Sequence, residues 1–90
     1  MIKYQVITEN FKADTQEVIA ADYETYLFDT LEEAIEWAKG EEPSMCERNE
    51  ALRRGEVIET SVNAGEWNED LEMFEDGCES VKVFHWMEEE

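Results

Sequence analysis

The chain has 90 residues, with 25 Asp and Glu against seven Lys and Arg, and a formal net charge of -18. An apolar share of 42%, with 11% aromatic residues, excludes a disordered acidic tail and predicts one folded domain over residues 1–90 with a small core. The charge excludes direct binding to nucleic-acid phosphates, which Lys and Arg contact, and opposes binding to an anionic membrane surface.

No apolar run approaches the roughly 18 residues that cross a bilayer. The segment that begins at Met1 lacks the hydrophobic region of a signal peptide, so we expect a cytoplasmic protein. The separation of Cys46 and Cys78 matches no zinc or thioredoxin-like pattern. Two buried or idle thiols are expected in a reducing compartment, and a disulfide between them is the alternative.

The first predicted elements are two strands that form an N-terminal hairpin. Ile2, Tyr4 and Val6 alternate with polar residues, as expected for a half-buried strand. Residues 17–28 are rich in β-branched and aromatic side chains and predict a second, long strand. Two adjacent alanines leave residues 15–22 open to a short helix instead.

A helix is predicted to begin after Thr30, because Thr30 and Glu33 form a capping box in which each side chain accepts a hydrogen bond from the other residue's backbone N–H. Gly40 supplies the left-handed residue that ends such a helix. The apolar stripe of this helix consists of Leu31, Ala34, Ile35 and Ala38, with Trp37 at its flank.

A second helix is predicted by another capping box, formed by Ser44 and Glu47, and by Gly55 at its end. Its thin apolar stripe places this helix on the surface of the domain. The stripe consists of Met45, Ala51 and Leu52.

From Glu56 onward the apolar period changes to two, which predicts a three-stranded antiparallel meander. Its turns are expected at residues 63–66 and at Asp76–Gly77. The opposite parity of Phe84 and Trp86 predicts either a last strand covered on both faces or an exposed aromatic patch. The residues expected to point inward are Ile58, Thr60, Val62, Trp67, Leu71, Met73, Val81, Val83, His85 and Met87.

Together these elements predict an α+β domain of order ββααβββ. Its antiparallel sheet is formed by the N-terminal hairpin and the C-terminal meander, and both short helices lie on one face of that sheet.

The sequence predicts no enzyme, no cofactor and no metal site. His85 is the only histidine, and its pairing with Cys78 across the last hairpin is the one catalytic arrangement left open. The carboxylates do not follow the spacing of a calcium loop, and the four glycines form no phosphate-binding loop. One hypothesis is therefore an enzyme or ligand-binding domain whose pocket the sequence does not reveal.

The distribution of carboxylates is the main functional signal. Between positions 66 and 79 there is no Lys or Arg, and the seven acids are Glu66, Glu69, Asp70, Glu72, Glu75, Asp76 and Glu79. On a strand, Asp70 and Glu72 would project from one face about 6.6 Å apart, close to the separation of successive backbone phosphates. Three acids of the first helix would extend this field, and three aromatic residues would supply apolar anchors. These are Glu32, Glu33 and Glu36, and Trp67, Phe84 and Trp86.

In its size, its charge and its lack of catalytic motifs, the chain resembles the small phage and mobile-element inhibitors that act as nucleic-acid mimics, including anti-CRISPR and anti-restriction proteins. This resemblance implies a non-enzymatic inhibitor that occupies the basic nucleic-acid-binding channel of a host defence nuclease, such as a CRISPR effector or a restriction enzyme, or of another DNA-binding protein. We expect a monomer or a homodimer in the host cell cytoplasm.

The alternative is an ordinary small protein whose acidic surface serves solubility or adaptation to high salt. The predominance of Glu over Asp argues against this reading, because adaptation through acidic surface in general does not require that bias.

Overall fold

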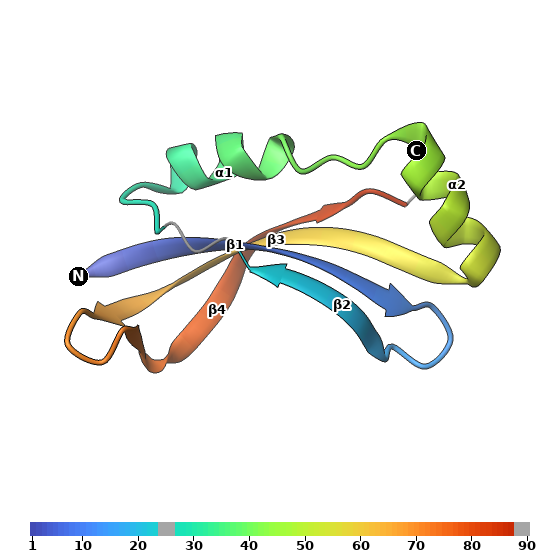
Figure 1. Cartoon of the computed structure of the whole chain (residues 1–90). Helices are drawn as coiled ribbons and strands as arrows, with labels where there is room; N and C mark the ends of the chain where they lie inside the picture. The colour runs from blue at the N-terminus through green and yellow to red at the C-terminus, as the bar shows by residue number, and fades with distance from the viewer. Residues whose placement is uncertain (24–26, 88–90) are drawn as a thin grey trace.

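The computed structural model shows one antiparallel sheet with both helices on the same side (Figure 1). The structure describes residues 1–23 and 27–87. Its elements are β1 (Ile2–Lys12), β2 (Val18–Tyr23), α1 (Leu31–Lys39), α2 (Met45–Arg54), β3 (Glu56–Asn68) and β4 (Met73–His85). The strand order in the sheet is β2-β1-β3-β4, so β2 and β4 form its edges. The predicted α+β class is confirmed.

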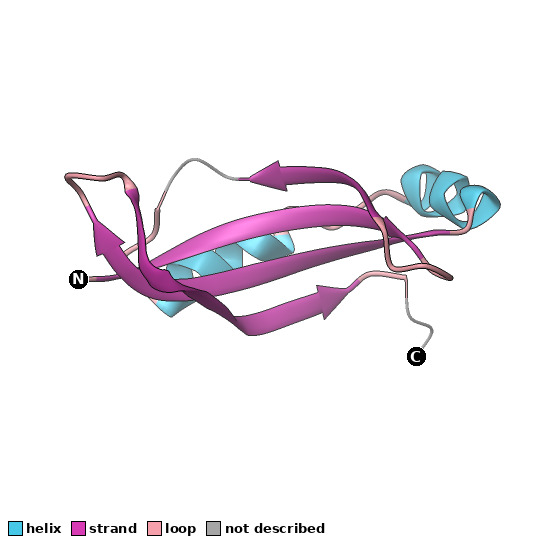
Figure 2. Cartoon of the chain, turned by 90° about the horizontal axis from the view of Figure 1, so that it is seen from below, coloured by secondary structure: helices cyan, strands magenta, loops and turns pink. Residues whose placement is uncertain are grey.

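The helices differ in how much of the sheet they cover. In Figure 2, which shows the molecule from below, α1 lies behind the central strands and α2 lies beyond one end of the sheet. α1 contacts both β1 and β3, whereas α2 contacts β3. The opposite face of the sheet carries no helix among the described residues, so both helices lie on one side of the sheet.

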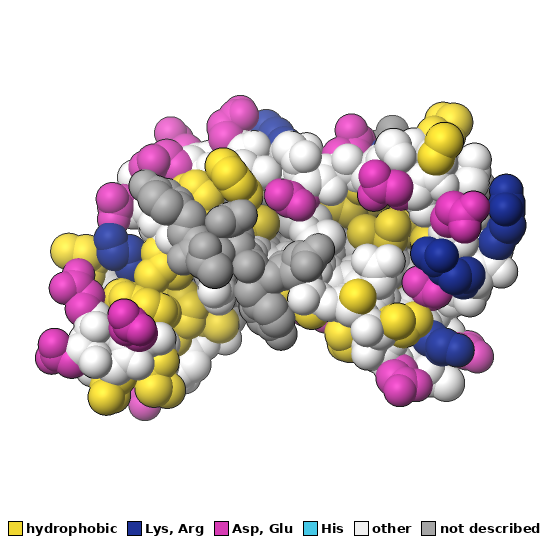
Figure 3. Space-filling model, viewed as in Figure 1, with side chains coloured by type: hydrophobic (Ala, Val, Ile, Leu, Met, Phe, Trp, Pro, Cys, Tyr) yellow, Lys and Arg dark blue, Asp and Glu magenta, His cyan; other side chains and the backbone are white. Residues whose placement is uncertain are grey.

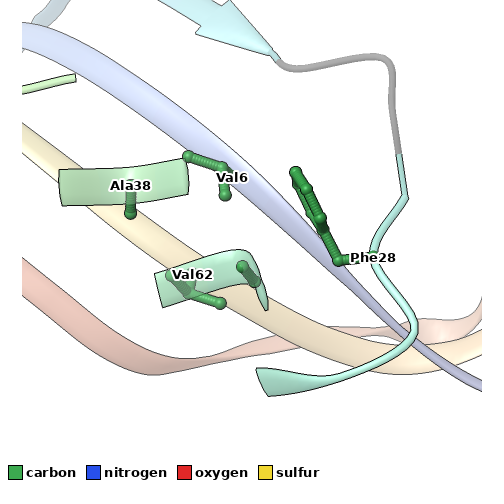
Figure 4. Close-up of a cluster of buried hydrophobic side chains, with 5 residues drawn as sticks. Val6, Phe28, Ala38 and Val62 are labelled. Carbon is green, nitrogen blue, oxygen red and sulfur yellow. The ribbon is translucent and has the colours of Figure 1, made fainter. Parts of the chain in front are cut away.

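The core lies between α1 and the two central strands (Figure 4). Val6 on β1 and Val62 on β3 are directly opposite each other in the sheet, and both are buried. Ala34 and Ala38 of α1 are fully buried above them, since their small side chains allow the helix to approach the strands closely. Phe28 completes the cluster. Burial of each valine contributes about 1.5–3 kcal/mol.

The start of α1 agrees with the prediction, but its end does not. The Thr30 side chain accepts a hydrogen bond from the Glu33 backbone N–H at 3.2 Å and donates one to the Glu33 carboxylate at 3.0 Å. Gly40, however, has a φ of -70° in the right-handed region. The left-handed ending was therefore wrong. Tight i→i+3 hydrogen bonds carry the chain away from the helix, including those donated by Gly40 and Glu41.

α2 is a surface helix, as predicted. The Ser44 side chain accepts a hydrogen bond from the Glu47 backbone N–H at 3.2 Å, and Gly55 ends the helix with a φ of 70°. The predicted apolar stripe is only partly correct. Ala51 is buried, whereas Met45 and Leu52 are 74% and 64% exposed.

The second strand is confirmed over Val18–Tyr23, which excludes a helix there. The rest of the predicted strand is different. Residues 24–26 lie outside the described part, and Phe28 forms an isolated antiparallel bridge with Tyr4. The bridge is closed by two hydrogen bonds, which the backbone N–H groups of Tyr4 and Phe28 donate at 3.0 and 2.9 Å.

The turn predicted at residues 63–66 is wrong, because β3 continues through it to Asn68. The absence of a side chain at Gly65 allows β3 and β4 to approach each other closely. A Cβ atom at this position would lie 2.7 Å from the Gly77 carbonyl oxygen and 2.9 Å from the Phe74 ring. Asn63 is buried and bonded, since it donates to Ser61 Oγ and accepts from Ser80 Oγ.

The reversal predicted at Asp76–Gly77 is also wrong. Both residues have positive φ, 56° and 79°, as a tight turn would require, but they lie within β4. The β3–β4 pairing shifts register between Ala64 and Glu66, which is the signature of a β-bulge beside this left-handed pair. The chain reverses instead at residues 69–72. The C-terminal part is one long hairpin, and the strand count is four.

The face of β4 that points toward α1 is the opposite of the predicted one. Phe84 packs against the core cluster on the α1 side, and the following Trp86 donates its indole N–H to Thr60 Oγ1 at 2.8 Å. Val81 and Val83 are 43% and 36% exposed. The aromatic residues replace the valines on the inner side because the register shift at Val62/Asn63 changes the parity along β4.

Neither described helix is long and apolar enough to cross a membrane.

Candidate functional site

The β3–β4 hairpin brings all seven predicted carboxylates of residues 66–79 to one end of the molecule, here called the hairpin end. Figure 3 shows acidic and apolar side chains next to each other at this end, on the left. Glu66 and Glu75 are direct partners across the ladder. Like charges at opposed positions destabilise a sheet. The fold therefore holds these two carboxylates together against their repulsion.

The tip of the hairpin is ordered by its own hydrogen bonds. The side-chain oxygen of Asn68 accepts from the backbone N–H of Asp70 at 2.9 Å and from that of Leu71 at 3.1 Å. The Asn68 amide group donates to the Glu75 carboxylate at 2.9 Å. These bonds form an Asx turn, which fixes the backbone that carries the tip carboxylates.

The predicted linear row of charges is wrong. Asp70 and Glu72 lie in the turn at residues 69–72 and not on a strand, so the spacing expected for alternate strand residues does not apply to them. Glu72 has a φ of 50°. The tip therefore presents its carboxylates around a turn.

Four of the seven carboxylates surround a hollow of about 370 Å³ on the hairpin. A Cβ atom on Gly77 would meet no atom within 4 Å, so the absence of a side chain there leaves space open. The hollow is lined by Glu66, Glu75, Asp76 and Glu79, and by Ile2, Ala64, Gly65, Gly77 and Cys78. That these four carboxylates surround a hollow could not be predicted from the sequence, because their placement depends on the bulge that sets β4 against β3.

The charge at the hairpin end is almost uncompensated. Glu66 forms an ion pair with the Met1 ammonium group at 2.5 Å. Within the described ranges, none of the other six carboxylates forms a salt bridge, and Glu69, Asp70, Glu72, Asp76 and Glu79 are exposed. These groups are available to a cationic partner.

The three predicted acids of α1 form a second acidic surface, here called the helix rim. Glu33 is engaged in the capping box, and Glu36 lies 3.9 Å from Lys39 Nζ. All three, Glu32 included, are exposed and lie beside Trp37, which is 46% exposed. The helix rim and the start of β1 lie toward the same end of the molecule as the hairpin tip in Figure 1.

The predicted aromatic anchors have different environments. Trp86 is half-buried, donates its indole N–H to Thr60, and stacks on Phe84 with ring centroids 5.1 Å apart and planes at 10°. Trp67 lies on the hairpin, where it packs edge-to-face against Phe74 at 5.1 Å. Trp86 therefore lies apart from the hairpin carboxylates, whereas Trp67 lies among them.

A contrasting arrangement occurs at residues 41–56, here called the arginine end. Arg48 pairs with Glu42 at 2.9 Å. Glu50 is shared by Arg53 and Arg54 at 3.4 and 3.8 Å, and Arg54 also pairs with Glu56 at 2.9 Å. Three of the five acids of this end are thus paired with arginine within the protein.

The one histidine belongs to an arrangement that the sequence did not suggest. His85 Nδ1 lies 2.5 Å from the Glu59 carboxylate, and Glu59 is the ladder partner of Glu9. Glu9, Glu59 and His85 thus form a row across three strands, and only knowledge of the sheet register could have predicted it. Cys78 lies on the same strand as His85, so the pair across a hairpin does not form; both Cys46 and Cys78 are free and exposed. In the described part of the chain, no group of three His, Cys, Asp or Glu residues could hold a metal ion.

Comparison of the chain with protein-family models, curated proteins and solved structures finds no significant match. Function is therefore inferred from the geometry of the acidic surfaces.

Proposed function

We propose that the protein is a non-enzymatic inhibitor that mimics DNA or RNA and occupies the basic nucleic-acid-binding channel of a host defence nuclease, or of another DNA-binding protein, in the host cytoplasm. The observation that supports this proposal most directly is the hairpin end, where seven carboxylates are carried on an ordered backbone with almost no internal compensation. A restriction enzyme and a CRISPR effector are the target classes that the chain's resemblance implies.

Fixed carboxylates suit this role for two reasons. Long-range attraction between a chain of charge -18 and a basic channel accelerates their encounter, particularly at low ionic strength. An ordered hairpin also loses less conformational freedom on binding than a flexible acidic tail would lose. Charge thus provides the attraction, and the Asx turn and the strand pairing keep its geometry.

The apolar residues of the hairpin end favour binding over mere solubility. Leu71 and Met73 are 66% and 54% exposed at the tip, and Ile2 is 47% exposed on the neighbouring strand. A surface that served only solubility would gain nothing from exposed apolar side chains among its charges. In a binding surface, the same side chains add apolar area that is buried from water when the partner binds.

The proposal is tested by affinity capture from a bacterial lysate at low ionic strength, with elution by salt and identification of the bound proteins. The test variant combines Glu69→Gln, Asp70→Asn, Glu72→Gln and Glu79→Gln, none of which removes a hydrogen bond or salt bridge that the described structure contains. The matched control removes four charges away from the hairpin tip, through Glu9→Gln, Asp14→Asn, Glu17→Gln and Glu41→Gln; none of these carboxylates forms a salt bridge in the described residues, and Asp14→Asn keeps the side-chain oxygen that accepts from the Thr15 backbone N–H.

We expect the wild type and the control to retain one nucleic-acid-handling protein and the hairpin variant to lose it. The captured protein should also release its DNA or RNA when the wild type is added. Recovery of no protein, or equal retention of unselected basic proteins by both variants, would assign the acidic surface to solubility instead.

A further inference from the structure

A shallow, mostly apolar hollow lies beside α1, with a volume of about 550 Å³. Its floor is formed by Phe28 and Trp37, whose ring centroids are 5.7 Å apart with the planes tilted by 45°. Among the described residues, the rest of its lining is the helix rim, formed by Glu32, Glu33 and Glu36. An apolar floor and an acidic edge are thus combined between Phe28, which precedes the helix, and the first two turns of α1.

The exposure of Trp37 follows from the way α1 packs. The helix presents Ala34 and Ala38 to the sheet, and both are fully buried. Trp37 lies one position before Ala38, at the flank of the buried stripe, so its ring extends over Phe28 and remains 46% exposed. An exposed tryptophan beside a hollow is typical of a binding surface, because Trp combines a large apolar area with few rotatable bonds.

The charge around the hollow defines what can enter it. Lys39 is the only basic residue of α1, and it lies 3.9 Å from Glu36, so the rim is net negative. A nucleic acid would be repelled, and so would a second copy of this chain with its charge of -18. A segment with basic residues would be attracted. Its apolar side chain would displace water from the Trp37 ring.

We propose that this hollow binds a segment of a partner protein in which one large apolar side chain is flanked by Lys or Arg residues. This inference rests on the proposed function, since the segment belongs to the same basic partner. It adds an apolar anchor to the electrostatic contacts: the carboxylates govern the rate of association, and burial against Trp37 slows dissociation. It therefore predicts a target whose basic channel has an apolar side chain at its border.

The test uses two synthetic peptides of equal charge, acetyl-Lys-Lys-Leu-Lys-Lys-amide and the same peptide with Ser in place of Leu. Binding is followed by NMR through backbone amide signals and the indole N–H signals of the three tryptophans, assigned with a Trp37→Phe variant. We expect the Leu peptide to bind on the order of tenfold more tightly than the Ser peptide, as the burial of most of a Leu side chain predicts. Its shifts should be concentrated at the Trp37 indole and residues 32–38.

Three variants separate the apolar contribution from the charge. Trp37→Ala should abolish the preference for Leu and leave the charge-driven binding of both peptides. Glu32→Gln combined with Glu36→Gln should weaken both peptides and leave the preference. Leu52→Ala, which removes an apolar side chain that is 64% exposed on α2, is the matched control and should change neither. The amide spectrum of each variant verifies its fold.

Equal affinity for the two peptides, or shifts spread over the hairpin end without a maximum at Trp37, would overturn this inference. The mapping on the wild type decides this point even if Trp37→Ala fails to fold. Charge-dependent capture of a nucleic-acid-handling protein would be unaffected by that result, so the proposed function can stand when the anchor fails. Loss of the capture while the Leu preference persists would instead reject the mimic.

Discussion

The two ends of the molecule use the same residue types in opposite ways. At the arginine end, Glu42, Glu50 and Glu56 each lie within 4 Å of an arginine, at distances between 2.9 and 3.8 Å. At the hairpin end, seven carboxylates stand within fourteen positions that contain no basic residue. These three acids of the arginine end are paired within the protein. At the hairpin end Glu66 pairs with the Met1 ammonium group and Glu75 accepts from Asn68, whereas the other five carboxylates form no salt bridge in the described residues and are available for an external cation.

The backbones of the two ends also differ. The arginine end is built from local signals, namely the Ser44 cap and the left-handed Gly55. The hairpin end depends on a close approach between strands, since Gly65 lies directly against the Gly77 carbonyl. The carboxylates of the hairpin end are therefore carried on a backbone that needs a close approach between strands. An acidic surface that served only solubility would not need such a backbone.

The largest expected effect is that of Gly65→Ala. Its Cβ would lie 2.7 Å from the Gly77 carbonyl oxygen, which is backbone and cannot rotate away. We expect a loss of about 1–3 kcal/mol in the free energy of unfolding, measured by urea denaturation. Gly55→Ala meets no atom within 4 Å and suffers only the strain of a φ of 70°, about 1 kcal/mol. A Gly65→Ala variant no less stable than Gly55→Ala would contradict the close approach.

A smaller effect compares the ordering groups of the two ends, through Asn68→Ala and Ser44→Ala. Each removes side-chain hydrogen bonds to backbone N–H groups, and each should cost about 1 kcal/mol. Hydrogen exchange locates the damage. Asn68→Ala should accelerate exchange at the amides of Asp70 and Leu71, and Ser44→Ala that at Glu47. Unchanged protection of Asp70 in Asn68→Ala would show that the tip is not held by the Asx turn.

The sequence predicted what local interactions determine. Both capping boxes involve residues three apart, so Thr30 with Glu33 and Ser44 with Glu47 could be recognised without knowledge of the sheet. The grouping of the hairpin carboxylates was likewise foreseeable, because they are close in sequence. The fold class followed from the order of strand and helix patterns.

The sequence could not predict what the sheet register determines. Asp76–Gly77 has the composition of a tight turn, and its left-handed backbone is the conformation such a turn uses, yet pairing with β3 makes it a bulge. The same register turns Trp86 toward Thr60 and sets His85 beside Glu59. Each of these contacts joins residues 26 positions apart, which no periodic pattern within a strand reveals.

The smallest expected effect tests the comparison of charges most directly. Glu69→Gln combined with Glu72→Gln removes two uncompensated charges from the hairpin tip, so the melting temperature should rise at low ionic strength because self-repulsion is reduced. Glu42→Gln combined with Glu50→Gln removes the same number of charges at the arginine end but breaks pairs with three arginines, so the melting temperature should fall.

Each of these changes should correspond to a few tenths of a kcal/mol, as is usual for exposed charges. Thermal unfolding at about 10 mM and 500 mM salt measures them, since screening at the higher concentration should bring both variants toward the wild type. Changes in melting temperature of opposite sign at low salt would establish that the carboxylates of the arginine end form stabilising internal pairs and that those of the hairpin tip do not. A fall in melting temperature for both variants would mean that the hairpin carboxylates also stabilise the fold, and their availability to a partner would then be lost.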